Sequence, residues 1–216
     1  MKPLGRVKIE WSPEFAYAIG LLVTDGCLYG DGKTMNLTSK DEEQLLHFKK
    51  CLGIDNKIGF KPSGYSSEQA MQIQFCDVLF YKFLNDIGIT PRKTKTIGVV
   101  QIPDEYFFDF LRGHHDGDGT FYSYWDPRWA SSFMFYTVFL SASKIHVKWI
   151  RAKLLELLGI QGHMTATGNT PIHSIKYAKA ESLQLLQKMY YNPHVVCLSR
   201  KRKKIEMALA VEGKHL

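Results

Sequence analysis

The sequence predicts an α+β fold made of two similar repeats, residues 1–103 and 104–216, each with an antiparallel sheet covered by helices on one face. An internal repeat is the first observation. YAIGLLVTDG at 17–26 is matched by FLRGHHDGDG at 110–119, and the two copies are offset by 93 residues. In both copies a glycine precedes an Asp-Gly pair at the same spacing.

The second observation is that the match continues downstream. LTSKDEEQLLHFKKCLGI (37–54) corresponds to LSASKIHVKWIRAKLLELLGI (140–160). Each is predicted to be a strand end, a helix that begins at Ser-Lys, and a stop at Leu-Gly-Ile. Residues 73–89 correspond in the same way to residues 175–191. Each repeat is therefore expected to run helix, two strands, helix, two strands, helix, and then a basic segment.

Alternation of apolar and polar residues marks the strands of the first repeat, because successive side chains of a strand point to opposite faces. One face is predicted to cover the core and the other to meet solvent. The residues assigned to the core are Met35, Leu37, Ile58, Phe60, Met71, Ile73 and Phe75, and those facing out are Asn36, Thr38, Lys57, Lys61, Gln72 and Gln74.

Composition narrows the class of protein. Hydrophobic residues make up 45% of the chain, which is enough for a core, so a disordered chain is excluded. The net charge of +7 suits a polyanionic partner. The four cysteines form no CxxC pair, and neither a secretory signal nor a membrane span is apparent. We expect a soluble intracellular protein, in a prokaryotic cytoplasm or an organelle matrix.

Glycines in the middle of the two repeated helices are the next feature. Gly20 and Gly113 each cost about 1 kcal/mol relative to alanine in a helix. This cost is explained if the two helices press together and need their backbones close. Gly26 and Gly119 at the helix ends suit a C-terminal helix cap.

Asp25 and Asp118, at the ends of the same helices, carry the functional prediction. A carboxylate at a helix C-terminus opposes the helix dipole, and two such carboxylates side by side repel each other. A divalent cation between them relieves both conflicts, and carboxylate oxygens suit Mg²⁺. The alternative is that each Asp-Gly is an ordinary solvated turn. Two copies in register favour the metal site.

At this point the chain resembles a known family. AIGLLVTDG (18–26) and LRGHHDGDG (111–119) are similar to the two motifs of the monomeric LAGLIDADG homing endonucleases, which are typically intron-encoded. The resemblance implies a pseudo-twofold monomer with the motif helices at the interface. It also implies two sheets that form a saddle in the major groove of double-stranded DNA. Such enzymes use Mg²⁺ to cut both strands of a long asymmetric site and leave 3′ overhangs; Mn²⁺ and Ca²⁺ are alternative ions.

The resemblance assigns roles by position. Asp25 and Asp118 are the metal ligands, and the family's basic residue falls on Lys93 in PRKTK and on Lys201 in SRKRKK. Because the register of a short basic run is ambiguous, the neighbours Lys95 and Lys203 remain alternatives.

Two departures from the family motif stand out. Val23 and Thr24 replace its first Asp and its Ala, and His114-His115 replaces Leu-Ile. For the His pair we expect one ring to point outward and the other to be buried and hydrogen-bonded, rather than a metal site.

Direct readout of bases needs paired donors and acceptors on a surface that fits the major groove. Tyr29 and Lys33 are expected near the end of the first sheet, and the hairpin tip at 123–133 either grips a DNA flank or covers its own sheet. The candidate DNA-binding residues are Asn36, Thr38, Lys57, Lys61, Gln72 and Gln74 in the first repeat, and Tyr122, Tyr124, Arg128, His163, Thr165, Thr167, Ser174 and Lys176 in the second.

Two other functions compete with DNA cleavage. A protein with the same fold could bind nucleic acid without cutting it, as an intron-splicing maturase or a DNA-binding regulator. A repeat protein with no nucleic-acid partner would explain the fold but not the two acids. The sequence alone specifies neither the DNA target nor the host.

Overall fold

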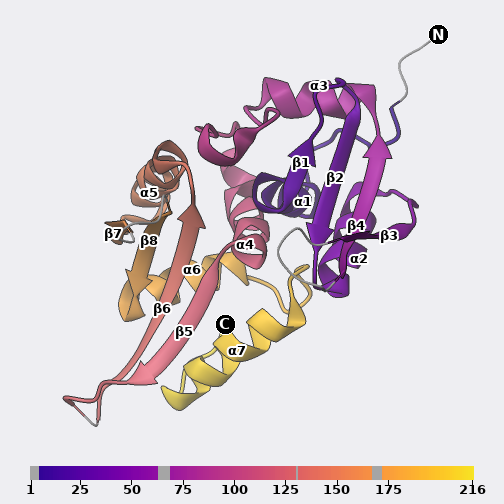
Figure 1. Ribbon diagram of the computed structural model, residues 1–216. Coiled ribbons are helices and arrows are strands. Elements are labelled where there is room, and N and C mark those ends of the chain that lie inside the picture. The colour runs from indigo at the N-terminus through magenta and orange to yellow at the C-terminus, as the bar shows by residue number, and fades with distance from the viewer. Residues whose placement is uncertain (1–4, 63–68, 130, 167–171) are drawn as a thin grey trace.

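The computed structural model describes residues 5–62, 69–129, 131–166 and 172–216 (Figure 1). In the first repeat the order is helix, two strands, helix, two strands, helix, as predicted. These elements are α1 (Pro13–Thr24), β1 (Gly26–Leu28), β2 (Thr34–Ser39), α2 (Glu42–Leu52), β3 (Ile58–Pro62), β4 (Gln69–Cys76) and α3 (Val78–Asp86). Two 3₁₀ turns, η1 (Lys93–Lys95) and η2 (Asp104–Tyr106), lie between α3 and the first helix of the second repeat.

The second repeat has the same order and one additional helix. Its elements are α4 (Phe107–Gly117), β5 (Thr120–Trp125), β6 (Phe133–Ser141), α5 (Lys144–Leu158), β7 (His163–Ala166), β8 (His173–Ala178) and α6 (Lys179–Met189). The additional helix α7 (Ser199–Val211) begins at the basic segment SRKRKK.

The two sheets have the same topology. Their strand orders are β1-β2-β4-β3 and β5-β6-β8-β7, and every pairing is antiparallel. Figure 1 shows one sheet on each side of the molecule, with α1 and α4 packed against each other between them. The predicted α+β architecture of two sheets in two repeats is confirmed.

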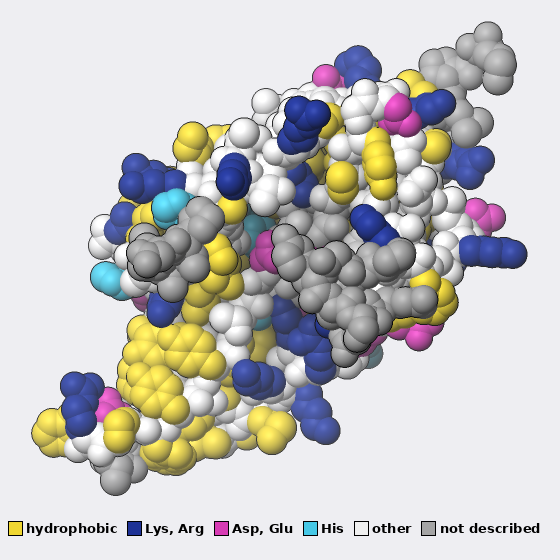
Figure 2. Space-filling model, viewed as in Figure 1, with side chains coloured by type: hydrophobic (Ala, Val, Ile, Leu, Met, Phe, Trp, Pro, Cys, Tyr) yellow, Lys and Arg dark blue, Asp and Glu magenta, His cyan; other side chains and the backbone are white. Residues whose placement is uncertain are grey.

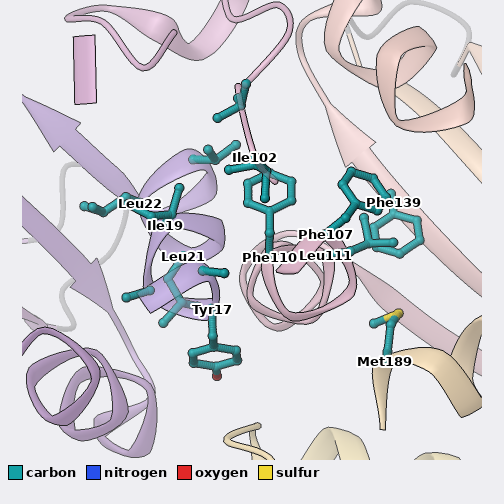
Figure 3. Packing of buried hydrophobic residues seen from close by; sticks show 14 of the residues in the cluster. Tyr17, Ile19, Leu21, Leu22, Ile102, Phe107, Phe110, Leu111, Phe139 and Met189 are labelled. Carbon is teal, nitrogen blue, oxygen red and sulfur yellow. The ribbon is translucent and has the colours of Figure 1, made fainter. Parts of the chain in front are cut away.

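Helices α1 and α4 form the centre of the hydrophobic core. Every residue of α1 from Phe15 to Val23 is buried, so this helix is covered on all sides and not on one face alone. Figure 3 shows Ile19 and Leu22 on α1 and Phe110 on α4 within one continuous cluster. The helix ends are therefore fixed by packing on both repeats.

Gly20 and Gly113 lie where the two helix backbones touch. A Cβ atom added to Gly20 would lie 2.2 Å from the carbonyl oxygen of Phe110, and one added to Gly113 would lie 2.0 Å from that of Tyr17. Both distances are far below van der Waals contact. Only glycine permits this approach, which explains its presence in the middle of each helix.

The structure corrects two details of the sequence prediction. The helix predicted to begin at Ser-Lys does so in the second repeat, where Ser143 caps α5, but α2 begins after Asp41. Ser39 instead corresponds to Ser141, since each accepts a hydrogen bond from the backbone two residues further on. Phe60, assigned to the core, is 67% exposed because it lies on the edge strand beyond the cover of α2.

All four cysteines are free thiols, as their spacing suggested. Within the described residues, no helix has the length and apolar character needed to cross a membrane.

Candidate active site

Asp25 and Asp118 occupy equivalent positions at the C-terminal caps of α1 and α4. The two helices bring these ends together: a Cβ atom added to Gly117 would lie 2.9 Å from Oδ2 of Asp25. Burial and the nearby Asp118 together raise the pKa of Asp25 to about 6, although Gln44 and both lysines oppose the rise. Burial also raises the pKa of Asp118. The site therefore holds two carboxylates whose joint ionisation is unfavourable without a cation.

Gly26 and Gly119 directly follow these acids, and the expectation of a glycine helix cap is wrong for both. Neither is among the glycines with positive φ in the described residues. Gly26 is instead the first residue of strand β1, and Gly119 directly precedes strand β5. A Cβ atom at Gly26 would lie 2.5 Å from the carbonyl oxygen of Leu22, and one at Gly119 would lie 2.7 Å from that of His115. The chain needs glycine here to fold back against its own helix.

Lys93 and Lys201 lie at the same pair of helix ends. Nζ of Lys93 donates to the carbonyl oxygen of Gly26 at 2.6 Å, and Nζ of Lys201 donates to the carbonyl oxygen of Gly119 at 2.7 Å. Lys201 also donates to the carbonyl oxygens of His115 and Asp116. Burial lowers the pKa of each ammonium group to about 8. The two lysines are thus held by equivalent carbonyls, although they come from different kinds of element.

The acids and lysines interact across the repeats. The electrostatic effect of Lys201 on Asp25 exceeds that of Lys93, and the effect of Lys93 on Asp118 exceeds that of Lys201. Each carboxylate is therefore influenced most by the lysine of the opposite repeat. The alternatives Lys95 and Lys203 are exposed.

Gln44, which was not singled out from the sequence, contacts one acid only. Its Nε2 donates to Oδ2 of Asp25 at 2.6 Å. Gln44 lies in the first turn of α2, and the equivalent position in α5 is His146, whose Nδ1 pairs with the carbonyl oxygen of Gly98 at 2.8 Å. The two acids are therefore supported differently. No local sequence signal marks Gln44, because its contact with Asp25 depends on how α2 packs against α1.

Asp116, two residues before Asp118, is a buried structural acid. Its Oδ2 accepts hydrogen bonds from the hydroxyl of Tyr17 and from the backbone N–H of Leu198, both at 2.8 Å. Leu198 is the N-terminal cap of α7, the helix that carries Lys201. Burial raises the pKa of Asp116 to about 6, and the Leu198 hydrogen bond opposes the rise. Asp116 thus anchors the start of the helix that presents Lys201.

A second pair of contacts ties α7 to the first repeat. Backbone N–H of Ser199 donates to the carboxylate of Glu43, and Nε of Arg200 donates to Oδ2 of Asp41 at 2.7 Å. Glu43 and Asp41 belong to the start of α2. Because Gln44 lies in the same turn, one turn of α2 supports both the Asp25 side chain and the helix that holds Lys201.

The expectation for the His114-His115 pair is wrong. Both side chains are buried, and neither points outward. Within the described residues, both ring nitrogens of His115 lack a hydrogen-bond partner. His114 stacks on His146 with ring centroids 5.2 Å apart. Burial lowers the pKa of His115 to about 3 and that of His146 to about 4, so both rings are neutral in the folded protein.

The buried ring of His115 gives a testable pH dependence. As pH falls below the unfolded pKa of about 6.5, the unfolded chain binds a proton at His115 and the folded protein does not. The free energy of unfolding therefore falls until the pH reaches about 3. Between pH 8 and pH 5 this loss is about 2 kcal/mol. Leu22 is the equivalent of His115 in the first repeat. Relative to the wild type, His115→Leu is therefore expected to be about that much more stable at pH 5 than it is at pH 8.

Urea denaturation at the two pH values measures this gain, with the exposed His194 replaced by leucine as the control. An equal effect of His115→Leu at pH 8 and pH 5 would show that the ring does not resist protonation in the folded state.

The donor set fits Mg²⁺, which was implied only by the resemblance. Mg²⁺ is held by one or two carboxylates together with water and phosphate oxygens, so Asp25 and Asp118 suffice on the protein side. Burial of these carboxylates favours a cation between them. In the part of the chain that the structure describes, no group of three His, Cys, Asp or Glu residues forms a self-sufficient metal site. A cation here would need oxygens from a phosphate or water.

The outer face of the first sheet, on the side away from the helices, carries most of the polar residues expected there. Register pairs Asn36 with Gln74 and Thr38 with Gln72, so these side chains share one face. Lys57, Lys61 and Gln74 are exposed, as are Tyr29 and Lys33 beside the sheet. Asn36 is a correction: it is only 2% exposed, and Nδ2 donates to Tyr29 and Gln72, so it supports its neighbours.

The outer face of the second sheet includes Tyr122, Tyr124, His163, Thr165 and Lys176, as expected from the register. Ser174 is a second correction, since its side chain is buried and its hydroxyl hydrogen-bonds to that of Thr165 at 2.6 Å. The prediction for Thr167 lies outside the described residues.

The hairpin tip between β5 and β6 covers its own sheet with one of its two tryptophans. Trp125 packs on Phe133 of its own sheet, with ring centroids 5.1 Å apart. Trp129 is 69% exposed, and Arg128 forms an ion pair with Asp126. Trp125 therefore covers the sheet, whereas Trp129 is free to contact a partner.

Comparison with solved structures identifies the fold of the chain. The chain has the two-repeat LAGLIDADG fold, which it shares with solved structures at low sequence identity. Neither a known family model nor a curated protein sequence matches it.

Three solved structures illustrate the similarity. The homing endonuclease I-WcaI bound to its DNA recognition sequence superposes with a TM-score of 0.59 at 13% identity, covering 90% of this chain and 88% of that one. The meganuclease I-SmaMI, bound to an uncleaved DNA target with calcium ions, gives 0.59 at 14% identity, covering 94% and 92%. The N-terminal LAGLIDADG domain of WhiA gives 0.55 at 14%, covering 92% and 88%. At these identities the similarity establishes the fold alone.

Proposed function

We propose that this protein is a Mg²⁺-dependent, site-specific endonuclease that cuts both strands of a long asymmetric DNA site and leaves 3′ overhangs. The observation that carries the proposal is the pair of acids, Asp25 and Asp118, at the touching ends of α1 and α4, with a buried lysine beside each end. Residues 1–103 and 104–216 then act as the two halves of one monomer, one for each DNA strand.

The two carboxylates have a defined role in this proposal. Asp25 and Asp118 would hold Mg²⁺, which supplies Lewis-acid polarisation of the scissile phosphate. Their rigid helix-end positions set where a phosphate must lie. Because Asp25 is half-buried, its interaction with a cation is stronger than it would be in water.

Lys93 and Lys201 provide positive charge at the same place. Charge on the non-bridging phosphate oxygens rises in the transition state, and an ammonium group fixed nearby offsets it. A pKa of about 8 also lets each lysine exchange a proton with an attacking water near neutral pH. The hydrogen bonds to the carbonyls of Gly26 and Gly119 hold both groups in place.

Binding of double-stranded DNA is supported by the sheets and by the related structures. The eight described strands contain no Asp or Glu, and the chain has a net charge of +7. I-WcaI and I-SmaMI, which share the fold, were solved in complex with DNA. A surface without acidic residues on a basic protein favours a polyanionic ligand.

A protein of this fold that binds nucleic acid without cutting, such as an intron-splicing maturase or a DNA-binding regulator, is the second candidate. The similarity to the LAGLIDADG domain of WhiA supports it, because that fold match, with a TM-score of 0.55, is nearly as good as the 0.59 for I-WcaI. Hydrolysis of the DNA backbone distinguishes the proposed endonuclease from this second candidate.

Incubation with a duplex that joins the host sequences on either side of the gene tests the proposal. With Mg²⁺ we expect this duplex to be converted into two shorter products with 3′ extensions. With Ca²⁺ in place of Mg²⁺ we expect a bound complex and intact DNA. If the protein shifts the duplex and leaves it intact with Mg²⁺ and with Mn²⁺, the second candidate is correct.

The lysines give a separate prediction. Lys93→Met and Lys201→Met are each expected to reduce single-turnover cleavage by about 10²-fold, the amount typical for loss of one fixed transition-state donor. Binding in Ca²⁺ should change little, since each ammonium is buried at the site.

The exposed neighbours Lys95 and Lys203, replaced by methionine, are matched controls of the same residue type in the same segments. Equal losses in the control pair would assign the effect to general phosphate attraction instead of to the buried positions.

A further inference from the structure

The outer faces of the two sheets differ in chemical character, although the repeats share one topology. The register makes Asn36 and Thr38 of β2 equivalent to Val138 and Leu140 of β6. An amide and a hydroxyl in the first repeat are thus replaced by two aliphatic side chains in the second. The same face of β6 continues with Tyr136 and Met134.

Three tyrosines extend this apolar surface. Tyr122, Tyr124 and Tyr136 stack with nearly parallel rings, with centroids 5.2 Å apart for Tyr122 and Tyr136 and 6.2 Å apart for Tyr124 and Tyr136. Tyr124 is 41% exposed, and the other two are half-buried.

We name these residues the β6 apolar face: Tyr122, Tyr124, Met134, Tyr136 and Leu140, with the buried Val138 as its floor. Figure 2 shows hydrophobic side chains gathered over β5 and β6, with Lys and Arg side chains beside them. Around the face, Lys176 lies on β8, and Arg200, Lys201 and Lys204 line a hollow with Thr120 and Phe121 of β5. Cations around an apolar surface, with no acid on any described strand, suit a polyanion that also presents apolar groups.

The major groove of DNA displays one apolar group, the C5-methyl group of thymine. An amide or a hydroxyl can hydrogen-bond to base edges, whereas leucine and methionine side chains can only pack against them. We propose that the β6 apolar face selects thymine by contact with its methyl groups, so that the half-site bound by the second repeat is thymine-rich. This inference rests on the proposed binding of DNA and adds the base preference of one arm.

Loss of one buried methyl contact weakens binding about fourfold, the effect expected for one methylene group. Replacing thymine by deoxyuridine removes that methyl group and leaves the Watson–Crick edge unchanged. The replacement therefore tests the contact itself and not base pairing. Two variants exchange the equivalent side chains of the two repeats: Leu140→Thr gives the second repeat the residue of the first, and Thr38→Leu gives the first repeat the residue of the second.

The experiment begins with selection from a library of randomised duplexes in Ca²⁺, followed by binding measurements on the selected site. We expect one arm to be thymine-rich, and deoxyuridine in that arm to weaken binding about fourfold at each contacted position. Deoxyuridine in the other arm should have no effect. Leu140→Thr should remove the sensitivity to deoxyuridine in the thymine-rich arm, and Thr38→Leu should create it in the other arm. Circular dichroism checks that both variants are folded.

Different failures have different meanings. A selected site that binds equally well with thymine or deoxyuridine in both arms would overturn the thymine inference and leave DNA recognition intact. Selection that yields no preferred sequence would contradict the proposed function as well. Concentration-dependent dimerisation that Leu140→Thr abolishes would assign the β6 apolar face to a second copy of the chain and would also overturn the inference.

Discussion

Asp25→Asn and Asp118→Asn are each expected to reduce double-strand cleavage by about 10³-fold or more while duplex binding is retained. The amide is the same size as the carboxylate but carries no charge to hold a divalent cation. Loss of metal-assisted charge stabilisation is worth several kcal/mol, and about 4 kcal/mol corresponds to a 10³-fold change in rate. Single-turnover cleavage with Mg²⁺ and binding with Ca²⁺ measure the two properties separately.

The same substitutions are expected to affect stability in the opposite direction. Burial raises the pKa of Asp25 to about 6, so its ionised form opposes folding above that pH. Without divalent cations, Asp25→Asn should therefore be more stable than the wild type at pH 8, and this advantage should disappear near pH 4. Asp55→Asn, at an exposed position of the same repeat, is the control. Lower stability of Asp25→Asn at pH 8 would show that the acid is structural.

The second large effect is expected at the helix contact. Gly113→Ala should destabilise the protein by more than about 3 kcal/mol or prevent folding, because the added Cβ would lie 2.0 Å from the carbonyl oxygen of Tyr17. Backbone on both sides prevents a small adjustment from relieving the clash. Midpoints of urea denaturation measure the loss.

Gly30→Ala is the matched control, since nothing lies within 4 Å of a Cβ atom at that position. Its stability should stay within about 1 kcal/mol of the wild type. If Gly113→Ala were equally mild, the two helices would not touch through their backbones, and the geometry that brings Asp25 to Asp118 would be wrong.

The sequence was sufficient to predict the elements that repeat. The offset of 93 residues made Asp25 and Asp118 equivalent, and the strand alternation gave the outward face of each sheet. Both are periodic patterns that depend on local backbone geometry. Gly20 and Gly113 also signalled a close contact, because glycine in a helix has a cost that only packing explains.

Contacts between segments that are distant in the chain left no periodic pattern in the sequence. Gln44 reaches Asp25, and Asp116 anchors Leu198, through chain segments that are distant in sequence. The burial of His115 and Asn36 likewise depends on what covers them and not on their own strand or helix. Comparison of the repeats gave no signal for the structural role of Asp116, because its counterpart Val23 carries no charge.

The central claim is that the two Asp-Gly helix ends form one active centre with one half-site for each DNA strand. Mapping the cut position on both strands of the joined host flanks, by sequencing the ends after incubation with Mg²⁺, tests it most directly. We expect one break in each strand, offset to give a 3′ extension, and both breaks absent in Asp25→Asn and in Asp118→Asn. Intact DNA in a specific complex with Mg²⁺, or cleavage that survives both substitutions, would contradict the claim.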